Sequence, residues 1–283
     1  MVYARRSLLR RTLTAGAAVI TLATASLGAG LAAGGCGEGA TGGKRVTLAT
    51  RAMLAEGAGS SSFTNAYGWS ITLTRAAVSV GSLYYFDGAP IVSARLSPGG
   101  PGDGLGRWVG IKSAHAHPGH YEPGNTKGQM LEPSSVDLLE GPFDLPVGSG
   151  VSGIVRSARF SFASPPAGPA AALLGDHVVV VEGEAVKGDL VRPFVATADL
   201  ADVLDANGEP WVEGCEFREV DVQADETVEV VIDPAIWLDQ SEFDAVAESE
   251  DGSPVPLDRG GAAHKAFVRG LKKGSAYVFR VAS

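Results

Sequence analysis

The sequence predicts an all-β fold, a mainly antiparallel sandwich or barrel with one or two short helices. Three observations support this prediction: many short runs of alternating or β-branched residues, strong turn dipeptides between them, and few helical signals. Glycine (38 residues) and proline (16 residues) exceed ordinary usage, while a hydrophobic content of 45% is too high for a disordered chain. We therefore expect a turn-rich globular domain.

Seven segments have the residue pattern of β-strands. In most of them apolar residues alternate with polar ones, as in strands with one buried face. Residues 177–181 instead form a continuous apolar run, which is typical of a strand covered on both faces. The predicted strands are residues 45–50, 69–74, 78–80, 155–162, 177–181, 228–232 and 277–281.

Turns and helices are signalled at a few positions. Asn207-Gly208 and Asp251-Gly252 predict turns, because these residue types accept positive φ at low cost. Asp233-Pro234 supplies an N-cap and a proline in the first helical position, which predicts a short helix through Trp237. Residues 262–272, followed by a glycine at 274, form the second candidate helix.

The chain divides into a signal peptide (residues 1–35), a glycine-rich tether (36–43) and one β-rich globular domain (44–283). Removing the first part takes away four arginines and no acidic residue, so the formal net charge falls from −9 to −13. The Gly/Pro-rich residues 98–106 are the nearest candidate for a further boundary, and we expect them to form a long loop.

The N-terminal segment has the three parts of an export signal. Its four arginines all precede Thr12, an apolar run covers residues 15–31, and small residues follow. A basic region, an apolar region and a small-residue exit predict a cleaved signal peptide. The alternative is a retained membrane anchor, because the uncharged stretch is long enough to span a bilayer.

Residues 5–10, Arg-Arg-Ser-Leu-Leu-Arg, resemble the twin-arginine motif, in which two arginines precede a polar residue and two large apolar residues. The resemblance implies export in a folded state, sometimes with a cofactor already inserted. An ordinary Sec signal with an arginine-rich start remains the alternative.

Residues 31–36, Leu-Ala-Ala-Gly-Gly-Cys, resemble a bacterial lipobox. The resemblance implies an exported lipoprotein precursor in which Cys36 becomes the lipidated first residue of the mature chain. The glycine-rich residues 37–43 suit a tether between membrane and domain. In the rival interpretation, cleavage occurs nearer residue 24 and leaves Cys36 free to pair with Cys215 in an oxidising compartment.

A histidine cluster is the only strong chemical signal. If the chain is extended, His115 and His117 point to the same face. Pro118-Gly119 suits the centre of a type II turn, which would bring the Cα atoms of His117 and His120 within ~7 Å. Three neutral imidazoles close together suit a copper or zinc ion. Candidates for a further ligand are Glu122, Met130, Tyr121, His177 and His264.

Two simpler interpretations of the cluster stay open: a solvated surface turn, or a binding loop without metal. We expect His177 at the edge of the core and His264 on a solvated face. Residues 148–153 fit the pattern G-x-G-x-x-G, but β-type residues follow instead of a helix, so we expect no dinucleotide site there. The four tryptophans are expected to anchor the core, with carbohydrate stacking as the alternative for one of them.

The sequence thus predicts a lipoprotein of the cell envelope, in the periplasm or on the outer surface, that binds copper or zinc through His-x-His-x-x-His. It resembles periplasmic copper-handling lipoproteins in the signal and this one loop. The membrane is the expected partner, through Cys36, while the negative charge argues against nucleic acid. The alternative is a non-catalytic module for glycan or protein recognition. We expect no enzyme, although a three-histidine site with Glu122 as base would permit a metal-dependent hydrolase or oxidase.

Overall fold

The computed structural model describes residues 43–55, 61–90 and 121–282, which belong to one compact unit (Thr41–Ser283). Several sequence predictions lie outside these residues and are not tested by the structure. They are the signal peptide, the tether with Cys36, the Gly/Pro-rich segment and the three clustered histidines. Among the described residues, no helix combines the length and hydrophobicity that a membrane span requires.

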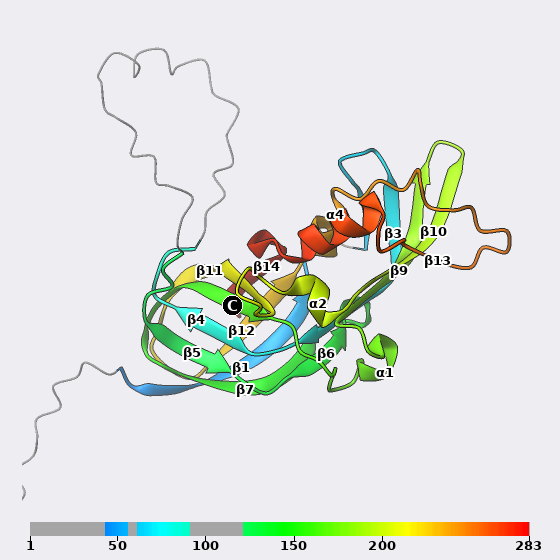
Figure 1. Ribbon diagram of the computed structural model, residues 1–283. Coiled ribbons are helices and arrows are strands. Elements are labelled where there is room, and N and C mark those ends of the chain that lie inside the picture. The colour runs from blue at the N-terminus through cyan, green and yellow to red at the C-terminus, as the bar shows by residue number, and fades with distance from the viewer. Residues whose placement is uncertain (1–42, 56–60, 91–120, 283) are drawn as a thin grey trace, which may run out of the picture. The chain divides into compact units, whose positions relative to one another are not determined.

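Eight strands close into a barrel (Figure 1). Two of the contacts around it, β1 with β12 and β11 with β14, are parallel, and the others are antiparallel. The strands in spatial order are β1 (Arg45–Leu54), β12 (Glu226–Ile232), β14 (Tyr277–Val281), β11 (Trp211–Val222), β8 (Gly153–Ser161), β4 (Leu83–Phe86), β5 (Thr126–Met130) and β7 (Phe143–Val151).

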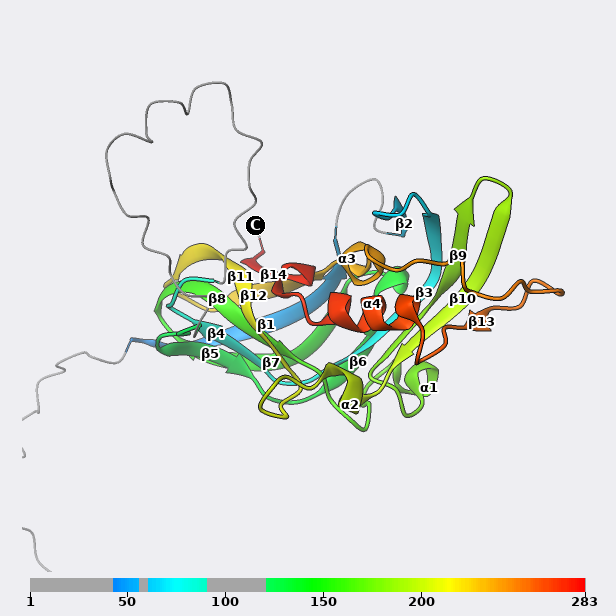
Figure 2. The same cartoon turned by 45° about the horizontal axis from the view of Figure 1, so that its top comes forward.

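A second sheet adjoins the barrel, and its β9–β10 hairpin extends away from it (Figure 2). The long strand β3 pairs with β9, β2 and β6. The strands of this sheet are β13 (Val255–Pro256), β10 (Leu190–Ala198), β9 (Val179–Lys187), β3 (Ser70–Val80), β2 (Ser62–Thr64) and β6 (Ser134–Asp137).

One large cluster of buried apolar side chains runs through both sheets. In the barrel, Tyr85 packs edge-on against Phe217 and Phe279. Phe160 stacks on Tyr277 with ring centroids 4.1 Å apart. Burial of each such ring contributes roughly 1.5–3 kcal/mol relative to leaving it in water. Side chains therefore fill the barrel, so a binding site on the barrel would lie on its wall or at its ends.

The helices are short, and most cover the sheets. Asp233 caps α3 (Pro234–Leu238) by accepting a hydrogen bond from the Ala235 N–H, as its sequence predicted. The longest helix, α4 (Ala262–Leu271), contacts α3 and β10. The remaining helical segments are α1 (Ala171–Leu174), α2 (Leu200–Val203), η2 (Leu138–Glu140) and η3 (Gly274–Ala276).

The all-β prediction is confirmed, with a barrel plus a second sheet as the architecture. Each of the seven predicted runs overlaps a strand, although the run at 177–181 is a strand only from Val179, and residues 69–74 and 78–80 belong to one strand, β3, rather than two. Gly208 and Gly252 adopt positive φ in turns, as expected. The expectation for His264 was wrong: it is buried on α4, where its Nε2 lies 2.9 Å from the Thr197 carbonyl oxygen.

Candidate functional site

The structure places two of the five sequence-predicted metal ligands, and it does not bring them together. Glu122 is exposed at the start of a described segment. Met130 is fully buried at the end of β5, opposite Leu83, and belongs to the hydrophobic core. Its thioether therefore packs against core side chains and is not available to a surface ion. The other predicted ligands, His115, His117 and His120, lie outside the described residues.

His177 is held in a surface ion-pair network. Its Nδ1 lies 2.5 Å from Asp199, whose second carboxylate oxygen is 2.6 Å from Arg259. Desolvation raises the pKa of Asp199, but the hydrogen bonds from His177 and Arg259 outweigh it, so the pKa lies below its ordinary value. Within the described part of the chain, no cluster of His, Cys, Asp and Glu has the arrangement of a metal site.

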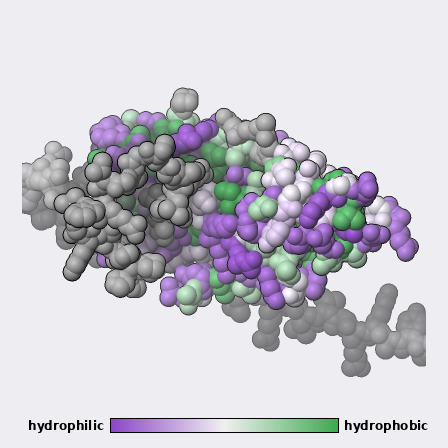
Figure 3. All heavy atoms as spheres, turned by 90° about the horizontal axis from the view of Figure 1, so that it is seen from above, coloured by the Kyte–Doolittle hydropathy of each residue, from purple (hydrophilic) through white to green (hydrophobic). Residues whose placement is uncertain are grey.

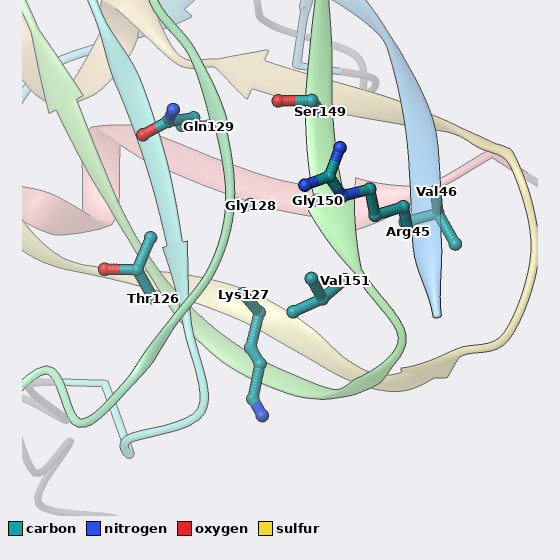
Figure 4. Close-up of a pocket in the computed structure, with 9 residues that line it drawn as sticks. All are labelled: Arg45, Val46, Thr126, Lys127, Gly128, Gln129, Ser149, Gly150 and Val151. Carbon is teal, nitrogen blue, oxygen red and sulfur yellow. The ribbon is translucent and has the colours of Figure 1, made fainter. Parts of the chain in front are cut away.

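A groove of about 320 Å³ lies where β5 meets β7 beside the start of β1 (Figure 4). The contact between β5 and β7 is short, with only Gly128 opposite Gly150 and Gln129 opposite Ser149. The groove follows this seam of the barrel. It is lined by Arg45, Val46, Thr126, Lys127, Gly128, Gln129, Ser149, Gly150 and Val151.

Glycines let the backbones of β5 and β7 approach closely at the seam. A Cβ on Gly148 would lie 2.6 Å from the carbonyl oxygen of Gln129. A Cβ on Gly150 would lie 2.7 Å from the carbonyl oxygen of Lys127. Any larger residue would push the strands apart, so the glycine-rich run closes the barrel and exposes backbone in the groove.

The groove carries two cationic side chains. Figure 4 shows Arg45 extending from β1 toward Gly150, while Lys127 projects from β5 at the other side. Lys127 Nζ lies 3.5 Å from Asp87. Desolvation raises the pKa of Asp87, but hydrogen bonds from Asn125 and the nearby ammonium outweigh it and lower the pKa, which keeps this carboxylate ionised.

A second groove, of about 370 Å³, is lined by acidic rather than basic side chains. Its lining includes Asp225 and Glu226, with Thr47 and Ala49 of β1 beside them. The two grooves therefore differ in the sign of their charge, and of these two, the groove at the β5–β7 seam favours an anion.

No family model, curated protein or solved structure matches the chain.

The chemistry of the seam groove is that of a donor-rich site for an anion. The Arg45 guanidinium offers planar, paired N–H donors, which match a carboxylate or a phosphate. Lys127 retains donors beyond the one directed at Asp87, because an ammonium has three. The side chains of Thr126, Gln129 and Ser149 can hydrogen-bond hydroxyl or ester oxygens of the same ligand.

Sequence reasoning missed the side chains of this groove. Its one available signal was the run at residues 148–153, which was considered as a dinucleotide motif. The structure confirms that no helix follows: β7 contains Gly148 and Gly150, and β8 begins at Gly153. The glycines act instead as the close-packing positions that form the groove.

Trp211 belongs to a separate aromatic cluster on the barrel wall. The Arg159 guanidinium lies 4.0 Å from the centre of its ring and also faces Phe86 and Tyr84. An Arg159 N–H donates to Glu213 at 2.5 Å. Since the guanidinium already covers a face of the indole, that face is occupied rather than open to a sugar. Trp69 and Trp237 are fully buried, as core anchors should be.

Proposed function

We propose that this protein is an exported, lipid-anchored, non-catalytic recognition module that binds an anionic group at the seam of its barrel. Its N-terminal sequence supports the export and the anchor, through the basic and apolar signal and the lipobox-like Cys36. The rigid barrel wall supports the binding role, because a filled core holds the groove residues in fixed positions.

The observation that carries this proposal is that Arg45 and Lys127 line the same groove of an acidic protein. The chain as a whole has a formal net charge of −9, so the two cations give this groove a charge opposite in sign to that of the whole chain. Arg45 comes from β1 and Lys127 from β5, and they line one groove only because the barrel closes. A ligand with a phosphate or carboxylate group gains charge-assisted hydrogen bonds from both side chains.

Calorimetric titration with inositol hexakisphosphate tests the groove. We expect the Arg45→Gln, Lys127→Gln double variant to bind at least about tenfold more weakly, because each charge-assisted hydrogen bond contributes roughly 1.5–3 kcal/mol. Binding should also weaken as salt is added. The matched control is Arg218→Gln, an exposed arginine on β11 that does not line the groove. Equal affinity in parent and double variant would show that the anion does not bind at the seam.

A second candidate function is binding of copper or zinc by His115, His117 and His120, which the His-x-His-x-x-His spacing supports. We expect His117→Ala together with His120→Ala to abolish micromolar metal binding, measured by calorimetry. His177→Ala is the matched control, since that imidazole is committed to Asp199. Metal affinity that survives in the double variant contradicts this candidate and leaves the anion site unaffected.

A further inference from the structure

Two large apolar side chains are exposed beside the cationic groove. Val147 is 66% exposed and Leu131 is 53% exposed, the highest values among large hydrophobic residues in the described part of the chain. The β5–β7 pairing ends at Gln129 with Ser149, and Leu131 and Val147 each lie two residues beyond that last pair, Leu131 just after the end of β5 and Val147 within β7. Side chains two residues apart on a strand share a face of the sheet, so Val147 lies on the same face as Ser149 of the groove, while Leu131 is exposed just past the end of β5.

Further exposed apolar residues lie on other elements of the described chain. On the face shown in Figure 3, hydrophobic side chains form small separate spots over the part that carries the second sheet. The exposed residues at the tip of the β9–β10 hairpin, Leu190 (38%) and Val191 (44%), have no described cationic groove beside them. Lys187 lies opposite Leu190 at that tip, but two carboxylates, Glu242 and Asp244, face its ammonium. The seam differs because two cationic side chains line one groove near its exposed apolar residues.

The cations lie where the described chain begins. Arg45 is the first residue of β1, and the backbone N–H of Lys44, which directly precedes it, donates to Ser152 Oγ beside the β7–β8 turn. Lys127 lies at the same end of the barrel, since an added Cβ on Gly153 would be 3.5 Å from its Nζ. Three basic residues thus gather at the point where the N-terminal segment joins the domain.

The length of that segment limits how far this end can lie from an anchor at Cys36. Seven residues lie between Cys36 and Lys44, which makes eight Cα-to-Cα steps, and a fully extended chain spans at most ~3.5 Å per step, so the distance is at most about 28 Å. A short tether gives the groove a high effective concentration at the surface that holds the anchor.

We infer that the partner of the seam groove is an anionic phospholipid bilayer. This inference rests on the proposed function and on lipidation of Cys36. Arg45 and Lys127 bind headgroup phosphates, with Lys44 adding attraction, while Leu131 and Val147 enter the interfacial layer. Asp87 and the exposed Glu132 lie close to these residues, so their negative charge keeps the attraction moderate.

Vesicle flotation of the full chain carrying Cys36→Ser tests the inference without a lipid on residue 36. Vesicles of phosphatidylcholine alone give the baseline, and vesicles that also contain phosphatidylglycerol supply the anionic surface. We expect phosphatidylglycerol-dependent binding to fall on the order of tenfold in Arg45→Gln, Lys127→Gln. We expect a roughly fivefold fall in Leu131→Ser, Val147→Ser. Fatty-acid labelling of the chain with native Cys36 is the companion test of the anchor.

The matched control for the apolar pair is Leu190→Ser, Val191→Ser, which removes exposed apolar side chains from the hairpin tip and should leave vesicle binding unchanged. Leu131→Ser, Val147→Ser should also keep the parent's affinity for inositol hexakisphosphate. If neither seam variant lowers vesicle binding while the soluble anion still binds, the bilayer is excluded as partner and the anion site stands. If the protein binds neither the phosphatidylglycerol vesicles nor inositol hexakisphosphate, the proposed function fails as well.

Discussion

Replacing Gly270 by alanine is expected to lower the free energy of unfolding by about 3 kcal/mol, although alanine is the better helix former. Gly270 lies on α4 where this helix crosses α3. An added Cβ would overlap the carbonyl oxygen of Trp237 and lie 2.6 Å from its Cα. The gain in helix propensity is about 1 kcal/mol, and separating two packed helices costs more than that.

Thermal unfolding measures this effect, and a loss of about 3 kcal/mol corresponds to a Tm lower by roughly 6–12 °C. The matched control is Gly260→Ala, where an added Cβ meets only ordinary contacts, the nearest at 3.6 Å to Asp258. We expect the control to stay within about 0.5 kcal/mol of the parent. Equal stability of both variants would mean that α3 and α4 can move apart freely.

The sequence predicted those elements whose signal is local. Alternation in residues 45–50 and the apolar run at 177–181 each mark a strand by themselves, and Asp233-Pro234 marks the start of α3. The strands β5 and β7 lack such a signal. β5 (Thr126–Met130) is mostly polar, and β7 (Phe143–Val151) contains a proline and two glycines. Their strand conformation depends on neighbours that are distant in sequence.

The candidate site was harder to predict for the same reason. Arg45, Lys127 and Ser149 are separated by many residues and share a groove only after the barrel has closed. The glycines of residues 148–153 were visible, but their purpose depends on the approach of β5, which no local pattern encodes. Met130 shows the opposite error: its nearness in sequence to the histidines suggested a ligand, while the alternation of β5 turns its side chain into the core.

Cys215 gives the second large effect, a loss of stability in alkaline solution. Its thiol is free and fully buried on β11, with Sγ 3.3 Å from the Val212 carbonyl oxygen. Burial raises the pKa of this thiol from an ordinary 9.0 to about 12. A disulfide between Cys36 and Cys215 would therefore require the barrel to open around β11.

The direction of the pH dependence follows from which state holds the proton. Below pH 9 the thiol is protonated in the folded and unfolded chains alike, so its titration does not lower the free energy of unfolding. Between pH 9 and about 12 the unfolded chain loses this proton and the folded chain keeps it. Folding then weakens by about 1.4 kcal/mol for each pH unit, or roughly 2–3 kcal/mol at pH 11.

Denaturant unfolding at pH 8 and at pH 11 measures this change. With Cys36→Ser as background, Cys215 is the only remaining cysteine, and Cys215→Ala is the comparison. The cavity in the alanine variant lowers its free energy of unfolding by the same amount at both pH values, whereas only the parent loses stability through titration of the thiol. The difference in unfolding free energy between parent and variant should therefore shrink by roughly 2–3 kcal/mol from pH 8 to pH 11. Burial also raises the pKa of Tyr85 and Tyr277, and this effect of burial is present in both chains. Parallel stability curves, or rapid alkylation of the native thiol at pH 8, would contradict a sealed barrel interior, because either result requires water to reach Cys215 in the folded state.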